Sequence, residues 1–124
     1  MEELVKEIRK SFQQISNKQL KLGWLLNEIY ESFEDYEFQE AYGTFPSFIA
    51  ESGKSIKQVR PFMNAAKWVK DSGLTLNDVV DIPITKLNLM FKCQVPISDD
   101  LLYDLRELAY SDIQIKFGDK DEYE

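Results

Sequence analysis

Apolar residues recur along the chain at spacings of three and four, which is the period of an amphipathic α-helix. The first stripe consists of Leu4, Val5, Ile8, Phe12 and Ile15. Directly after it, Ser16-Asn17-Lys18-Gln19 has the S-x-x-Q pattern of a capping box and predicts the start of a second helix. The apolar positions of that helix include Leu20, Leu22, Trp24, Leu25, Ile29 and Phe33. We therefore expect two helices here, followed by a loop or a short turn over residues 31–39.

Hydroxyl residues, prolines and glycines divide the rest of the chain, because hydroxyls cap helix starts and glycine ends helices in a left-handed conformation. The first expected elements are a short helix Pro46–Glu51 capped by Thr44 and a tight turn Ser52-Gly53-Lys54. A longer helix follows, from a second S-x-x-Q box at Ser55 to about Lys70, and Gly73 ends it. After it we expect a short helix capped by Thr75 and two leucine-rich helices, Lys86–Lys92 capped by Thr85 and Asp99–Tyr110 capped by Ser98. Pro61 lies inside the longest of these and should bend it, because proline removes a backbone hydrogen bond.

The C-terminal segment is ambiguous in its local pattern. Residues 113–117, IQIKF, alternate like a strand, yet no other segment offers a partner strand, so we expect a last helical turn capped by Ser111. The fold predicted from all these elements is all-α, a compact bundle of about five to seven short helices. It forms one domain over residues 1–117 and is followed by a solvated acidic tail over residues 118–124.

The segment from Pro46 to Lys70 has the order of a helix-turn-helix: a short helix, a glycine turn, a capping hydroxyl and a longer helix. Gly53 allows the sharp turn, and Val59 is placed to pack the two helices together. The longer helix has an inward apolar stripe, Ile56, Val59, Met63, Ala66 and Val69, and an opposite polar face, Lys57, Arg60, Asn64 and Lys67. The polar face is therefore the candidate for binding.

Charge is distributed unevenly along the 124 residues, whose formal net charge is -7. Residues 31–52 carry six acids and no base, whereas residues 53–70 carry five bases and no acid. A basic segment is what phosphate contact requires, so we expect this helix to bind DNA. The expected DNA-binding residues are Lys54, Ser55, Lys57, Gln58, Arg60, Asn64 and Lys67, with the cations at phosphates and Ser55, Gln58 and Asn64 nearer the bases.

The order of these motifs resembles a loose class of small phage- and plasmid-encoded helix-turn-helix proteins. The matching segments are an aromatic turn, Tyr42-Gly43-Thr44-Phe45-Pro46-Ser47-Phe48-Ile49, the G-x-S-x-x-x-V start of a recognition helix at Gly53, Ser55 and Val59, the segment Pro83-Ile84-Thr85-Lys86-Leu87, and the leucine-rich Leu101-Leu102-Tyr103-Asp104-Leu105. The likeness spans roughly residues 20–117 and implies a regulator or replication accessory of a mobile element. Lys54 and Pro61 depart from the class pattern, and both lie at the helix that would read DNA.

An acidic, aromatic segment supports a different function. Between Leu22 and Gly53 there is no Lys or Arg. The candidate protein-binding residues in this alternative are Glu31, Glu34, Asp35, Tyr36, Glu37, Phe38 and Glu40. Such a surface could dock on a basic groove, as an inhibitor or DNA mimic that blocks a nucleic-acid enzyme. The competing interpretation places the aromatics in the core and leaves the carboxylates as solubilising charges. A homodimer that pairs acidic with basic segments is a third alternative.

Composition argues against catalysis, metal binding and a membrane span. The chain has no histidine, no glycine-rich phosphate loop and no carboxylate cluster with the spacing of a calcium site. We therefore expect a non-enzyme without cofactor or metal. No apolar run approaches the roughly 20 residues of a membrane span. The single cysteine, Cys93, cannot form an internal disulfide and the N-terminus lacks a secretion signal, so we expect a cytoplasmic protein.

Overall fold

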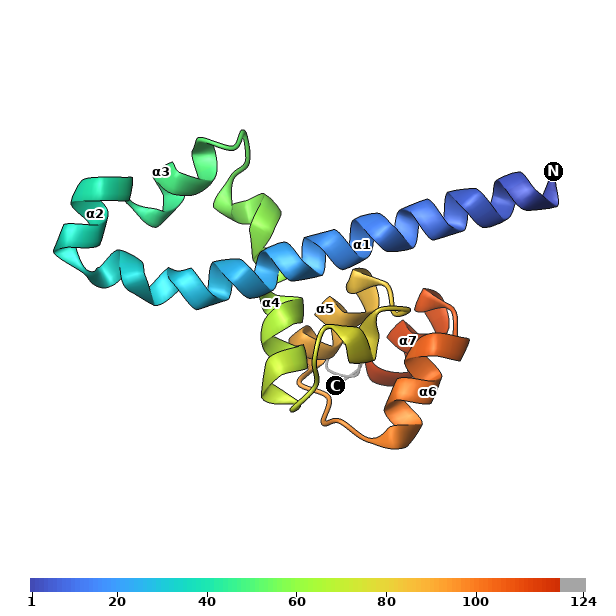
Figure 1. Cartoon of the computed structure of the whole chain (residues 1–124). Coiled ribbons are helices and arrows are strands. Elements are labelled where there is room, and N and C mark those ends of the chain that lie inside the picture. The colour runs from blue at the N-terminus through green and yellow to red at the C-terminus, as the bar shows by residue number, and fades with distance from the viewer. Residues whose placement is uncertain (119–124) are drawn as a thin grey trace.

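The computed structural model describes residues 1–118, which form seven α-helices and two 3₁₀-helices with no strand among them. In chain order these are α1 (Glu2–Tyr30), η1 (Glu31–Glu34), α2 (Tyr36–Tyr42), α3 (Phe45–Ala50), α4 (Ile56–Asp71), η2 (Asn77–Val79), α5 (Ile84–Cys93), α6 (Asp99–Glu107) and α7 (Tyr110–Phe117). The predicted all-α fold is confirmed. Helices α4 and α5 pack against the middle of α1, with α6 and α7 on the same side of α1 as α5, while α2 and α3 lie near the C-terminal end of α1 (Figure 1). Apart from Gly118, the predicted acidic tail lies outside the described residues.

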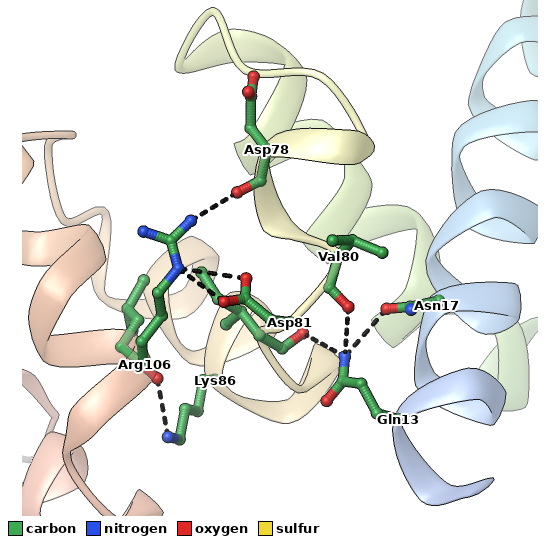
Figure 2. A network of polar contacts seen from close by, with 9 residues as sticks. Gln13, Asn17, Asp78, Val80, Asp81, Lys86 and Arg106 are labelled. Carbon is green, nitrogen blue, oxygen red and sulfur yellow. Dashed lines mark hydrogen bonds and ion pairs between the residues drawn. The ribbon is translucent and has the colours of Figure 1, made fainter. Parts of the chain in front are cut away.

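The first 30 residues form one helix, and the predicted second start at Ser16 is wrong. Ser16 is buried, and its hydroxyl oxygen accepts a hydrogen bond from the backbone N–H of Ile84 at 2.6 Å. On the same side of α1, the Gln13 amide donates to the carbonyls of Val80 and Ile82, at 3.2 and 3.1 Å (Figure 2). The Ser16 hydroxyl thus serves another part of the fold, and no local cap competes with the continuation of α1.

Buried apolar side chains form two clusters, and α4 contributes to both. The large core has fourteen buried members from α1, from the second half of α4 and from the chain beyond it, among them Leu20, Val69 and Leu105. The small core has five, which are Leu26, Phe33, Phe45, Ile49 and Val59. The predicted packing of Val59 between the short helix and the longer helix is confirmed, because Val59 of α4 and Ile49 of α3 share the small core. Helix α4 is thereby fixed at both of its ends.

Helices α1 and α4 cross with their backbones in close contact. A Cβ atom built on Gly23 would lie 2.1 Å from the carbonyl oxygen of Phe62, so only glycine fits there. One turn further on, the Asn27 side chain donates to the Met63 carbonyl at 2.8 Å. Helix α4 remains helical through Pro61, and the bend expected at that residue stays a prediction.

The local caps of α3 and α4 agree with the sequence. Thr44 accepts from the Ser47 N–H and begins α3, and Ser55 and Gln58 form the reciprocal capping box of α4. Gly53 and Gly73 both have the positive φ that a left-handed turn needs, 77° and 78°. These starts and stops were all correctly predicted.

Several other boundaries differ from the prediction. The expected loop over residues 31–39 is instead η1 followed by α2, whose first turn is capped by Asp35. Thr85 lies inside α5, which begins without a side-chain cap of its own, whereas Ser98 does cap α6. The predicted helix Asp99–Tyr110 ends at Glu107. The helical prediction for residues 113–117 is confirmed, but α7 begins before Ser111, which does not cap it.

Helix α6 is attached to the loop after α4 through charged side chains. Arg106 donates to the carbonyl of Asp78 at 2.8 Å and forms an ion pair with the Asp81 carboxylate at 3.0 Å (Figure 2). From the other side, the buried Lys86 ammonium donates to backbone carbonyls at the end of α6. These contacts fix α6 relative to α5 and to the segment that follows α4.

Candidate nucleic-acid interface

The N-terminal half of α4 is the exposed half of the predicted recognition helix. Lys54, Ser55, Lys57, Gln58 and Arg60 are all exposed, as the polar-face prediction requires. Further along, the helix becomes part of the large core through residues 65, 66, 68 and 69. A ligand could therefore reach the first two turns of α4, whereas the large core covers residues 65, 66, 68 and 69.

Two of the predicted base-reading residues already have structural roles. The Ser55 hydroxyl accepts from the Gln58 N–H at 3.3 Å, and the Gln58 side-chain oxygen accepts from the Ser55 N–H at 2.9 Å. This reciprocal pair satisfies two backbone donors of the first turn. It leaves the Gln58 side-chain nitrogen, a donor, available to a ligand, while the Ser55 hydroxyl oxygen is already engaged.

A hollow of about 490 Å³ lies between α4 and α5 and brings together cations from both helices. Lys57 and Arg60 come from α4, and Lys92 comes from the last turn of α5. All three are exposed, and no carboxylate lines the hollow. None of them forms an ion pair with another described residue; the three pairs found there involve Lys67, Arg106 and Lys116. The hollow is therefore a site of uncompensated positive charge.

Amide side chains at the same hollow add hydrogen-bonding capacity. Asn64 from α4 and Asn88 from α5 both line it. The Asn88 side-chain oxygen is itself buried and accepts no hydrogen bond from the described residues, so it is a buried acceptor without a partner and is not exposed to a ligand in the hollow.

Sequence reasoning did not include Lys92 and Asn88 in the site. Asn88 lies 17 residues and Lys92 lies 21 residues beyond the end of α4 at Asp71, and only the packing of α5 on α4 brings them to the basic face. A weak signal was present: residues 88 and 92 are four apart and so share one face of α5. The sequence alone could not show which element that face adjoins.

A second hollow, about 300 Å³, lies on the other side of the same polar face. It is lined by Arg60, Asn64 and Lys67 together with residues of α1 and α3, including Asn27 and Tyr30. Arg60 and Asn64 therefore line both hollows. Lys67 is paired with Asp71 at 3.3 Å, an exposed pair one helical turn apart that contributes little stability. All the predicted residues of the polar face are thus brought to one surface.

The acidic alternative site is only partly assembled. The carboxylates of Glu31, Glu34, Glu37 and Glu40 are exposed, but Asp35 accepts from the Glu37 N–H and caps α2. Its aromatic residues divide between core and surface. Phe38 is half-buried against Phe33, with ring centroids 4.8 Å apart, whereas the Tyr36 side chain is 72% exposed. Tyr36 is therefore the residue of this segment that is free to act as an aromatic anchor.

Residues 1–118 contain neither a metal-ligating cluster nor a membrane-spanning helix. No group of three or more metal-ligating side chains is close enough to hold an ion in this range. No helix in this range has both the length and the apolar character needed to cross a bilayer. Comparisons of the chain with protein-family models, with curated proteins and with solved structures find no match.

Proposed function

We propose that this chain is a non-enzymatic DNA-binding protein that contacts duplex DNA through the first two turns of α4 and the adjoining end of α5. The observation that carries the proposal is the cluster of Lys57, Arg60 and Lys92 around one hollow without a carboxylate. By its resemblance to phage- and plasmid-encoded helix-turn-helix proteins, it would serve a mobile element as a regulator or accessory factor.

The local electrostatics favour a polyanion at this place. The first turn of α4 contains no acidic residue, so the partial positive charge of the helix N-terminus adds to the charge of Lys57. In α1 and α6, by contrast, carboxylates occupy the first turn. Lys54, in the turn before α4, is exposed and extends the positive surface toward α3.

The position of each residue along α4 predicts whether it contacts the phosphates or the bases of DNA. Recognition helices present their N-terminal residues to base edges, and the surrounding cations hold the backbone. Lys54, Lys57, Arg60 and Lys92 would contact phosphates. Asn64 and the free nitrogen of Gln58 would lie nearer the bases, where amides can pair with adenine.

The overall charge of -7 sets the expected strength of binding. The rest of the surface repels DNA, so the basic cluster must act at short range, and affinity should fall steeply with salt. Each phosphate contact contributes a slope of about -0.9 in log affinity against log salt concentration. Lys57, Arg60 and Lys92 together predict a slope of about -3 or steeper.

Fluorescence anisotropy on a labelled mixed-sequence duplex, titrated upward from low salt, tests the proposal. Lys57→Glu/Arg60→Glu should weaken binding at least tenfold and flatten the salt slope by about two. The matched control is Lys6→Glu/Lys70→Glu, which changes the net charge equally at exposed positions outside the hollow. Equal loss in both variants, or no binding by the wild type at low salt, contradicts the proposal.

The exposed Tyr36 among carboxylates favours one second candidate, an acidic module that blocks a nucleic-acid enzyme by occupying its basic groove. Its test is inhibition of a panel of such enzymes. Inhibition that is lost in Glu34→Lys/Glu37→Lys but kept in Lys57→Glu/Arg60→Glu would favour this candidate. Asp35 is left unchanged because its carboxylate caps α2.

A further inference from the structure

The smaller of the two hollows beside the polar face of α4 has the construction of a small-molecule site. It measures about 300 Å³ and lies where α3 and the first half of α4 meet the C-terminal part of α1 (Figure 1). Sites for small ligands occupy roughly 300–1,000 Å³ and combine a mostly apolar lining with a few polar groups. The size of this hollow therefore suits one small organic molecule.

Apolar side chains from all three helices line the smaller hollow. Tyr30 of α1 and Phe45 of α3 pack edge to face, with ring centroids 4.9 Å apart, and the exposed Pro46 follows Phe45. From α4 come Ile56 and Met63, which are half-buried. Tyr30 remains 49% exposed although it belongs to this lining. An apolar ligand would cover these surfaces, and the aromatic rings favour a planar one.

The polar part of the lining carries positive charge that is not offset within the smaller hollow. Arg60 and Lys67 both line it, and among the residues that the structure describes no Asp or Glu does. Arg60 forms no ion pair with another described residue. Lys67 has the exposed pair with Asp71, which contributes little and can be exchanged for a ligand. A guanidinium presents a planar fork of donors that matches a carboxylate, so an anionic group fits this side of the hollow.

Contacts within the lining hold the smaller hollow in shape without a ligand. The Asn27 side chain donates to the Met63 carbonyl at 2.8 Å, and both residues line the hollow, so α1 and α4 are joined there. Phe45 is also a member of the small core, together with Val59 of α4, which fixes α3 against the same helix. A site that is already formed loses less conformational freedom when a ligand binds.

From this apolar lining and the two cations beside it, we propose that the smaller hollow binds a small organic acid, a planar apolar body that carries one carboxylate. Arg60 and Lys67 hold the carboxylate by charge-assisted hydrogen bonds, and the body covers Tyr30 and its apolar neighbours. Arg60 and Asn64 also line the basic hollow between α4 and α5. A carboxylate at Arg60 thus removes a phosphate contact, and the bound acid lowers the affinity for DNA. This regulatory consequence rests on the proposed function, whereas the binding of the acid does not.

The first experiment is an NMR titration of the isotope-labelled protein with phenylacetate, without DNA. Phenylacetamide is the matched neutral probe, and acetate is the matched anion without a ring. Phenylacetate should shift the side-chain N–H signals of Arg60, Asn27 and Asn64, with a dissociation constant on the order of 1 mM or tighter. The other two probes should bind at least several-fold more weakly. Absence of phenylacetate binding, or equal binding of either matched probe, overturns the proposal.

A pair of double variants tests the two cations. Arg60→Gln/Lys67→Gln should weaken phenylacetate binding at least tenfold. Lys57→Gln/Lys70→Gln is the matched control, because it removes two charges from the same helix at exposed positions that do not line the smaller hollow. It should bind phenylacetate like the wild type, and circular dichroism should show that both variants are folded. Equal weakening in the two variants, or none in Arg60→Gln/Lys67→Gln, overturns the proposal.

Fluorescence anisotropy on duplex DNA at saturating phenylacetate tests the regulatory consequence. The affinity of the wild type for DNA should fall at least several-fold, compared with sodium chloride at the same ionic strength. Unchanged DNA affinity with phenylacetate bound overturns the regulation. If the protein binds phenylacetate but no DNA at low salt, the result supports the smaller hollow as a ligand site and contradicts the proposed function.

Discussion

The Ser16 hydroxyl, in the middle of α1, accepts the backbone N–H of Ile84 at 2.6 Å and so caps the first turn of α5 from another helix. Helix α5 has Pro83 at its N-cap and no side-chain cap of its own. One of the orphan donors that every helix start exposes is therefore satisfied by a residue 68 positions away. The contact ties the long helix to the helix that supplies Lys92.

Ser16→Ala should lower the free energy of unfolding by about 1–3 kcal/mol, because it leaves the buried N–H of Ile84 without an acceptor. Urea denaturation monitored by circular dichroism measures this loss. Ser11→Ala is the control, since Ser11 is exposed on the same helix. Equal stability of the two variants would show that the Ser16 hydroxyl has no capping role.

Gly23→Ala should destabilise the protein, although alanine favours helices by about 1 kcal/mol over glycine. The new methyl group would overlap the carbonyl oxygen of Phe62, so α1 and α4 would have to separate. We expect a loss of at least 2 kcal/mol, typical of overpacking, in thermal or urea unfolding. Lys21→Ala, at an exposed position on α1, should be nearly neutral. A stabilised Gly23→Ala protein would contradict the observed close crossing.

Lys86→Met should destabilise the end of α6. The Lys86 ammonium donates hydrogen bonds to the carbonyls of Leu105 at 2.8 Å and Leu108 at 2.6 Å. Methionine has no donor, so both carbonyls would lose this hydrogen bond. The expected cost is about 1–3 kcal/mol, measured by urea denaturation. Lys92→Met, at an exposed position, is the control for stability.

Burial lowers the pKa of Lys86 below its ordinary value of 10.5. The unfolded chain then holds this proton more tightly than the folded one. Between the lowered pKa and 10.5, a rise in pH therefore increases the contribution of Lys86 to stability. Carbon NMR of the lysine side chains should show one amine titrating below the others. That signal should disappear in Lys86→Met, and its persistence would assign the shift to another lysine.

Asp78→Asn should reduce stability at neutral pH and have less effect in acid. Hydrogen bonds from the Thr75 backbone N–H and hydroxyl, at 2.8 and 3.0 Å, lower the pKa of Asp78 below 3.8, with a smaller contribution from Arg106. This stabilisation is complete above 3.8 and is lost as the pH falls through the lowered pKa. The difference in melting temperature between wild type and variant should therefore be complete at pH 7 and shrink as the pH falls below 3.8. Glu51→Gln is the exposed control.

The parts of the fold that the sequence predicted correctly are those fixed by neighbours in the chain. Thr44, Ser55 and Ser98 cap helices through N–H groups three residues ahead, so their patterns can be recognised locally. Ser16 has the same local pattern, but its partner is in α5, and the tertiary contact prevails over the local signal. A single sequence cannot show which hydroxyl will find a distant donor.

The same limit applies to the candidate site. Helical spacing alone placed Lys57, Arg60 and Asn64 on one face of α4, and they do line one surface. Lys92 and Asn88 join that surface because α5 packs beside α4. This packing depends on the shape of the large core, which no pattern of spacing along the chain expresses. The basic face of α4 could thus be predicted, but the residues that α5 adds to the site could not.

The division of α4 between two cores has a dynamic consequence. Its first two turns rest on the small core of five buried side chains, and its second half rests on the large core of fourteen. Regions with fewer buried contacts open at lower free energy, so α3 and the start of α4 should exchange amide hydrogens faster than α5. The surface offered to a ligand is then the part of the molecule that a ligand can most readily rigidify. Binding would be recorded there as slowed exchange, while the rest of the domain, already well protected, would change little.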